Sequence, residues 1–135
     1  MVAAIEQKIE GKYLEESQKK AILVPGKNVC INAGAGSGKT LTILGKIIHI
    51  LDQKLAKPEQ ILVMAFNRRV SIELKKRVND LAKEFPHLSK ELQDISIMEG
   101  IDRKIHTFHS FCFSEIVQKE NKTLANYLRT KDKNS

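Results

Sequence analysis

The sequence has few cysteines, no long apolar run and no segment of the kind that directs secretion, and each absence narrows the class of protein. Only Cys30 and Cys112 occur, and with no metal-ligand spacing between them we predict two reduced thiols in the core. The longest apolar stretches, residues 22–25 and 61–66, fall far short of the ~18 residues of a membrane span. The first residues include glutamates and lack a continuous apolar stretch, which indicates a cytoplasmic protein.

The length and the charge balance limit the function further. The chain has 135 residues, enough for one domain of ordinary size and too few for two. Apolar residues make up 41% and charged residues 29%, which is typical of a soluble globular chain rather than a disordered one. Lys and Arg total 23 against 16 Asp and Glu, giving a formal net charge of +7. This excess favours polyanion partners, either nucleotide phosphates or a nucleic-acid backbone, although solubility alone also explains it.

Strand-like and helix-like segments alternate along the chain, which predicts an α/β domain with a parallel sheet. Apolar periodicity predicts helices over residues 14–23, 41–52, 68–85, 88–92 and 108–128. Apolar runs predict strands over residues 28–32, 60–66 and 104–107. The first of these strands is expected to be buried on both faces, because its apolar character is continuous. We therefore expect a domain over residues 1–128 and a disordered polar tail over residues 129–135.

A glycine-rich loop, AGAGSGKT at residues 33–40, follows the first predicted strand and precedes a predicted helix. It fits the phosphate-loop pattern, with alanine in the first slot where the strict form has glycine. Glycines allow positive φ and leave backbone N–H groups pointing inward around the phosphates. Lys39 then reaches the β and γ phosphates, and Thr40 offers its hydroxyl to Mg²⁺, so both are candidate catalytic groups. The predicted nucleotide site comprises Ala33, Gly34, Ala35, Gly36, Ser37, Gly38, Lys39 and Thr40.

Four segments in this order resemble those of UvrD/Rep-type superfamily 1 DNA helicases, which are P-loop ATPases. They are LEESQKKAIL at 14–23, AGAGSGKT at 33–40, ILVMAFNRRVSIELKKRV at 61–78 and IHTFHSF at 105–111. The resemblance implies a partial RecA-like P-loop domain, with a short parallel sheet flanked by helices. It also implies ATP and Mg²⁺ as cofactors and DNA as a partner, in the cytoplasm, nucleoid or nucleus. It also implies that Gln18 contacts the adenine edge, which an amide can do because it donates and accepts at once. A solvent-facing helix glutamine is the alternative.

The same resemblance implies contacts with single-stranded DNA after the second and third predicted strands, from Phe66, Asn67, Arg68, Arg69, Thr107, Phe108 and His109, with Ser110 as a further candidate. Arg68 and Arg69 lie in the first turn of a predicted helix, where the positive end of the helix dipole disfavours cations. An unfavourable placement of this kind often marks a functional site. Phe66, at the carboxyl end of a strand, is placed either to stack on a base or to pack in the core. Lys75, Lys76 and Arg77 are expected to form a solvated helix face.

The sequence also departs from the family pattern. Hydrolysis in the family needs an acidic pair that holds Mg²⁺ and arginines from a second motor domain, and neither follows residue 116; Glu99 is a weak substitute in the wrong place. We therefore expect an N-terminal fragment of a helicase motor domain that binds nucleotide and single-stranded DNA but neither hydrolyses ATP nor unwinds DNA alone. Self-association or a missing C-terminal half would stabilise it. A stand-alone nucleotide-binding regulator and a DNA-binding accessory protein are the alternatives.

Overall fold

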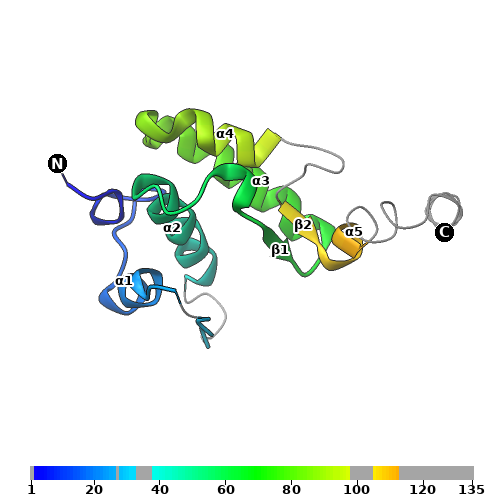
Figure 1. The fold of residues 1–135 in the computed structure, drawn as a ribbon, viewed down its shortest axis with the longest axis horizontal. Helices are drawn as coiled ribbons and strands as arrows, with labels where there is room; N and C mark the ends of the chain where they lie inside the picture. The colour runs from blue at the N-terminus through cyan, green and yellow to red at the C-terminus, as the bar shows by residue number, and fades with distance from the viewer. Residues whose placement is uncertain (1, 27, 33–37, 98–104, 113–135) are drawn as a thin grey trace, which may run out of the picture.

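The computed structural model describes residues 2–26, 28–32, 38–97 and 105–112 (Figure 1). In these residues a two-stranded parallel sheet is flanked by helices, which confirms the expected fold class and is consistent with a partial P-loop domain. The helices are α1 (Glu16–Leu23), α2 (Lys39–Asp52), α3 (Arg68–Glu84), α4 (Ser89–Ile97) and α5 (Phe108–Phe111), and the strands are β1 (Val63–Ala65) and β2 (Ile105–Thr107). Short 3₁₀ helices occupy Ala4–Glu6, Pro58–Gln60 and Pro86–Leu88.

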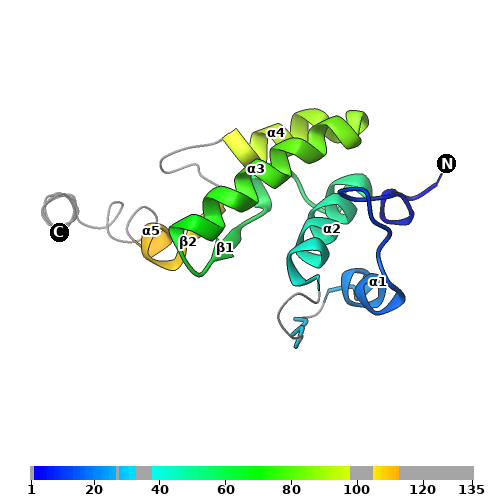
Figure 2. The same cartoon turned by 180° about the vertical axis from the view of Figure 1, so that it is seen from behind.

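The two strands pair side by side, and the chain between them supplies the helices that cover them. Val63 lies opposite Ile105, and Ala65 lies opposite Thr107. Parallel strands need a crossover connection, here made by α3, which packs on both strands, and α4, which packs against α3 (Figures 1 and 2). The buried stripe of α3 includes Leu74, Val78 and Leu81, at the spacing that the sequence predicts.

Helices α1 and α2 lie side by side in the N-terminal half of the molecule (Figure 2). Their close approach depends on Gly45 of α2. A Cβ atom at this position would lie 2.8 Å from Ile22 Cδ1 and 3.2 Å from Leu14 Cδ1, both from the α1 side. A larger side chain would therefore have to displace the ends of these two buried side chains. This packing fixes where α1 stands relative to the start of α2.

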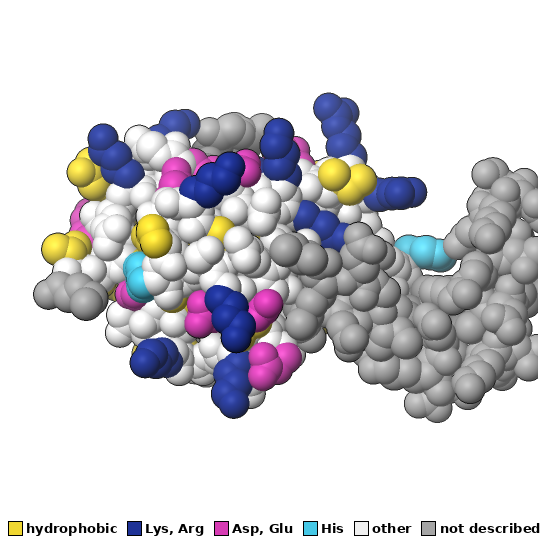
Figure 3. Space-filling view, turned by 90° about the horizontal axis from the view of Figure 1, so that it is seen from above, with side chains coloured by type: hydrophobic (Ala, Val, Ile, Leu, Met, Phe, Trp, Pro, Cys, Tyr) yellow, Lys and Arg dark blue, Asp and Glu magenta, His cyan; other side chains and the backbone are white. Residues whose placement is uncertain are grey.

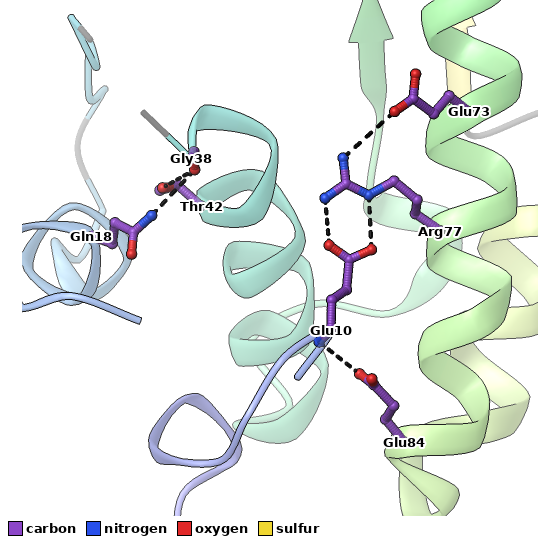
Figure 4. A network of polar contacts seen from close by, with 7 residues as sticks. All are labelled: Glu10, Gln18, Gly38, Thr42, Glu73, Arg77 and Glu84. Atoms are coloured by element: carbon purple, nitrogen blue, oxygen red, sulfur yellow. Dashed lines mark hydrogen bonds and ion pairs between the residues drawn. The ribbon is translucent and has the colours of Figure 1, made fainter. Parts of the chain in front are cut away.

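An ion pair joins the N-terminal segment to α3 (Figure 4). Ile9 and Lys12 exchange backbone hydrogen bonds of 2.8 and 3.1 Å around Glu10 and Gly11, which both have positive φ, as in a type I′ turn. The turn presents the Glu10 carboxylate to Arg77, whose Nε donates to Oε2 at 2.8 Å and whose Nη2 donates to Oε1. These hydrogen bonds from Arg77 lower the pKa of Glu10 below its usual 4.5. Arg77 is thus not part of a solvated face, so the expectation is wrong for this residue, whereas Lys76 is exposed.

We expect Glu10→Gln to reduce the free energy of unfolding by about 1 kcal/mol near neutral pH, because a two-point but partly solvated Arg–carboxylate pair is lost. The folded-state pKa of Glu10 is lower than the unfolded value of 4.5, so this stabilisation is present above pH 4.5 and is lost as the pH falls through the folded pKa. Urea unfolding near pH 7 and at about pH 3 measures the difference between the variant and the wild type, which should shrink at the lower pH.

The matched control is Glu73→Gln. Glu73 contacts the same guanidinium at 3.8 Å, and its side chain is 62% exposed, so this variant should change stability much less. Equal losses in the two variants, or a Glu10→Gln effect that is unchanged at low pH, would contradict the assigned role of Glu10.

The predicted strand over residues 28–32 is wrong. These residues form neither helix nor strand, and Val29 and Ile31 are 44% and 45% exposed. A strand exists only where a neighbour bonds to it, and in the described part of the chain the sheet consists of β1 and β2 alone. Both cysteines, expected in the core, are likewise exposed.

The predicted strands over 60–66 and 104–107 and the helices over 14–23, 41–52, 68–85 and 88–92 are confirmed as elements, and their boundaries shift. The second strand is shorter than residues 60–66, because Pro58–Gln60 forms a 3₁₀ turn. The helix predicted near 88–92 extends to Ile97, and the first helix begins at Glu16 rather than at Leu14. Most of the helix predicted over 108–128, together with Glu99, Lys104 and the tail over 129–135, lies outside the described residues.

Candidate nucleotide and nucleic-acid sites

The glycine-rich loop ends at Gly38, and the Gly38 carbonyl is an acceptor for groups from two helices. Gly38 has φ of +82°, a left-handed conformation that glycine adopts without strain and other residues rarely do, which confirms the expected positive φ here. Its carbonyl accepts from the backbone N and the Oγ1 of Thr42, both at 3.0 Å, and from Gln18 Nε2 at 3.2 Å (Figure 4). Residues 33–37 of the predicted site lie outside the described residues.

Gln18 bridges the start of α1 and the start of α2. Its Oε1 accepts from the backbone N of Glu15 at 2.8 Å, while its Nε2 donates to Gly38. The side chain is half-buried rather than solvent-facing, so the alternative assignment as a surface glutamine is wrong. Each end of the amide makes one of these hydrogen bonds within the protein, and an amide has a second N–H and a second oxygen lone pair with which it can meet an adenine edge. A Cβ at position 38 would also lie 2.7 Å from Gln18 Nε2.

A cavity of about 160 Å³ lies between α1 and the start of α2, with Gln18, Lys39 and Thr42 in its wall. Lys39 is the first residue of α2 and its side chain is exposed, whereas Thr40 is half-buried. The first turn of α2 carries no acidic side chain, so the positive end of the helix dipole and the ammonium group both favour an anion there. The structure therefore brings together Gln18, Gly38, Lys39 and Thr40.

Thr42 is the site residue that sequence reasoning missed. It is buried, and its hydroxyl donates to the carbonyl four residues earlier, a common habit of threonine in helices. The signal in the sequence is a threonine at that spacing after the last glycine of the loop. By bonding Gly38, Thr42 fixes the orientation of the peptide that precedes Lys39.

A second cavity, of about 590 Å³, lies where the start of α3 faces β2 and α5. Arg68, Lys75, Thr107, His109 and Ser110 are among the residues that line it. The first turn of α3 carries no acidic side chain, so an anion would not be repelled there. In Figure 3, several Lys and Arg side chains lie close together at the right of the described surface, and a histidine lies next to them. Residues from the two segments that were predicted to contact DNA therefore share one cavity.

Two aromatic side chains stand exposed at the carboxyl ends of the strands. Phe66 is 86% exposed and Phe108 is 60% exposed. They follow Ala65 and Thr107, which are partners in the β1–β2 register, so both residues lie at the same end of the sheet, where its strands end. The exposure of Phe66 rules out the alternative in which it packs in the core. Flat apolar surfaces beside cations are what a sequence-tolerant single-strand groove requires.

Two other residues that were predicted to contact DNA, Asn67 and Thr107, cap helices. Asn67 Oδ1 accepts from the backbone N of Val70 at 2.9 Å and so caps α3. Thr107 caps α5 in the same way: its Oγ1 accepts from the backbone N of Ser110 at 3.1 Å, while Ser110 Oγ accepts from the backbone N of Thr107 at 3.0 Å. Arg69 and His109 are exposed. Thr107 therefore lines the second cavity as well as capping α5, whereas Asn67 holds the start of α3, from which Arg68 reaches that cavity.

Comparison with known proteins gives one consistent result. The family model described as UvrD/REP helicase N-terminal domain matches residues 14–134. One subunit of an ATP-dependent helicase/nuclease from Clostridium kluyveri is 34% identical over 75% of this chain and 8% of its own length. The ATP-dependent DNA helicase Rep of Buchnera aphidicola is 37% identical over 82% of this chain and 15% of its own length. The chain thus spans only 8% to 15% of these relatives. No helix among the described residues is long and apolar enough to cross a membrane.

Proposed function

The chain belongs to the UvrD/REP helicase family, and from that premise we propose that it binds ATP or ADP with Mg²⁺ through residues 33–40. The observation that carries the proposal is the conformation of Gly38. Its φ is positive and its carbonyl accepts three hydrogen bonds, at the point where the chain enters α2. This is the geometry by which a phosphate loop passes into the helix that follows it.

Each described group has a distinct task in this proposal. Lys39 supplies the cation at the β and γ phosphates, and Thr40 supplies a hydroxyl to Mg²⁺. Gln18 contacts the adenine edge with its second N–H and the second lone pair of its Oε1. The small size of the described cavity, about 160 Å³, supports a base that lies over α1 rather than inside the fold.

Calorimetric titration of the purified chain with ADP and Mg²⁺ tests the proposal. We expect saturable binding with one nucleotide per chain. An absence of binding heat, together with no thermal stabilisation by ADP, would contradict it, since any ligand that binds only the folded state must raise the melting temperature.

We further propose that the second cavity and its rim bind single-stranded DNA. Arg68 and Arg69 supply positive charge, and Phe66 and Phe108 supply exposed rings on which bases stack. The net charge of +7 adds a long-range attraction for the phosphate backbone. What supports the proposal is that residues far apart in the sequence, such as Arg68 and His109, line the same cavity.

The double variant Arg68→Gln, Arg69→Gln should weaken binding of single-stranded DNA and flatten its dependence on salt. Each phosphate contact contributes about 0.7 to the slope of log K against log salt for single strands, so we expect the slope to fall by about 1.4. Fluorescence anisotropy with a labelled oligonucleotide at several salt concentrations measures it.

Lys83→Gln, Lys90→Gln is the matched control, since it removes the same charge from exposed positions outside this cavity. If the salt slope of the arginine variant is unchanged, Lys75 and Lys76 rather than the two arginines contact the phosphates. Equal slopes in the two double variants would show that only the overall charge matters.

A further inference from the structure

A hydroxyl group is buried where α2 begins. It belongs to Thr42, of which 4% is exposed. The other side chains that α2 buries are all apolar: Leu44, Ile47, Ile48 and Leu51. For packing alone a valine would serve at position 42, because valine is branched at Cβ like threonine. The hydroxyl of Thr42 therefore has a role that packing does not explain.

This hydroxyl donates to a carbonyl that already has a partner. Thr42 Oγ1 donates to the Gly38 carbonyl at 3.0 Å, and the backbone N of Thr42 donates to the same oxygen, also at 3.0 Å (Figure 4). The backbone bond is the one that every α-helix makes, so the carbonyl would be satisfied without the hydroxyl. The effect of the second bond is to restrain the direction in which the carbonyl points.

The direction of the Gly38 carbonyl also sets the direction of the Lys39 N–H. The two groups belong to one planar trans peptide, in which they point in opposite directions. Because the carbonyl points along α2 toward Thr42, the Lys39 N–H points out of the start of the helix, where N–H groups have no partner within the helix. An N–H in this orientation can donate to an anion at the start of α2.

Glycine makes this orientation easy to lose. Gly38 has φ of 82° and ψ of 26°, and glycine tolerates many other backbone conformations as well. If the peptide between residues 38 and 39 rotated, its carbonyl instead of its N–H would face the anion. Gln18 Nε2 also donates to the carbonyl, at 3.2 Å, but from another helix. Thr42 lies on the same helix as Lys39, so its restraint does not depend on how α1 packs.

We propose that Thr42 is a positioning residue for the nucleotide phosphates, because its hydroxyl keeps the peptide between Gly38 and Lys39 in the orientation that presents the Lys39 N–H to them. This inference rests on the proposed nucleotide site. Thr42 and Lys39 both line the cavity between α1 and the start of α2. A chain whose peptide is turned away for part of the time binds only in proportion to its correctly oriented fraction.

Thr42→Val tests the proposal, since valine keeps the branched shape and lacks the hydroxyl. The Gly38 carbonyl keeps its backbone partner, so no buried group loses its last hydrogen bond and the midpoint of urea unfolding should not fall. We expect the affinity for ADP with Mg²⁺, measured by calorimetry, to fall about three- to tenfold, the usual effect of one hydrogen bond.

Thr42→Ser is the rescue variant, because serine in a helix also donates to a carbonyl one turn earlier. It loses a buried methyl group and should unfold at a lower urea concentration than the wild type, yet it should bind ADP with close to the wild-type affinity. A residue that only supported the fold would give the reverse order, with affinity following stability across the two variants.

The amide resonance of Lys39 in the unliganded chain gives a second readout. It should broaden or split in Thr42→Val, because the peptide then exchanges between two orientations, and it should not do so in Thr42→Ser. The matched control is Ser96→Ala, which removes a buried hydroxyl that donates to the Gln93 carbonyl at 3.0 Å in α4, outside the cavity between α1 and the start of α2. This control should change neither the affinity nor the resonance.

Wild-type affinity for ADP in Thr42→Val, or equal losses of affinity in Thr42→Val and Thr42→Ser, would overturn the role of Thr42 and leave the nucleotide site standing. An unchanged Lys39 resonance in Thr42→Val would also overturn it. A wild-type chain that does not bind ADP would contradict the nucleotide site itself, and the role of Thr42 with it.

Discussion

Replacing Lys39 by alanine is expected to abolish binding of ATP and ADP, weakening affinity by about two orders of magnitude or more. An ammonium group that bonds phosphate oxygens makes a charge-assisted contact, which is about twice as strong as a neutral hydrogen bond. Lys39 also stands at the positive end of α2, where no acidic side chain in the first turn offsets it. Its loss would remove the cation that we propose at the β and γ phosphates, while the backbone of Gly38 stays in place. Calorimetry with ADP and Mg²⁺ measures the change.

Lys20→Ala is the matched control, because Lys20 is an exposed lysine near the end of α1 and does not line the cavity between α1 and the start of α2, which we call the nucleotide cavity after its proposed ligand. This variant should bind nucleotide like the wild type. If Lys39→Ala binds as well as Lys20→Ala, the phosphates do not lie at the start of α2 and the proposed site is wrong.

The second large effect concerns turnover: the isolated chain is expected to bind ATP without hydrolysing it above background, and not to unwind DNA. Phosphoryl transfer needs an oriented water, an acid that holds the Mg²⁺ shell and a cation from outside the loop, and an arginine supplied from outside contributes about 10³ to 10⁵ in rate. Among the described lining residues of the nucleotide cavity, the one carboxylate belongs to Glu15, at the start of α1.

Release of inorganic phosphate, with and without single-stranded DNA, measures this turnover. The wild-type rate should equal that of Lys39→Ala. DNA-stimulated hydrolysis that disappears in Lys39→Ala would show that the chain, or an assembly of its copies, completes the site, and binding without turnover would then be the wrong description.

The helices could be predicted from the sequence because each carries its own signal. The apolar stripe of α3 and the proline that follows it define that helix locally. The same holds for α2, whose apolar periodicity follows the glycine-rich loop. The segment at 28–32 shows the limit of this reasoning: its composition favours a strand, but a strand requires a bonding neighbour, and composition cannot supply one.

Contacts between distant residues could not be predicted. Glu10 and Arg77 are 67 residues apart, and no motif in the sequence around either residue indicates that they form an ion pair. The bond from Gln18 to Gly38 likewise depends on how closely α1 and α2 pack at Gly45. The resemblance to a family implied that Gln18 contacts adenine, whereas its hydrogen bonds to Glu15 and Gly38 are found only in the three-dimensional structure.

The exposure of both cysteines has a practical consequence for solution experiments. Cys30 lies two residues before Asn32, which lines the nucleotide cavity, and Cys112 lies two residues after Ser110, which lines the larger cavity. Because the chain has two cysteines in all, Cys112→Ser leaves one thiol beside the first cavity, and Cys30→Ser leaves one beside the second. A maleimide dye on either variant would report occupancy of one cavity at a time, and unlabelled stocks need a reductant to prevent disulfide-linked dimers.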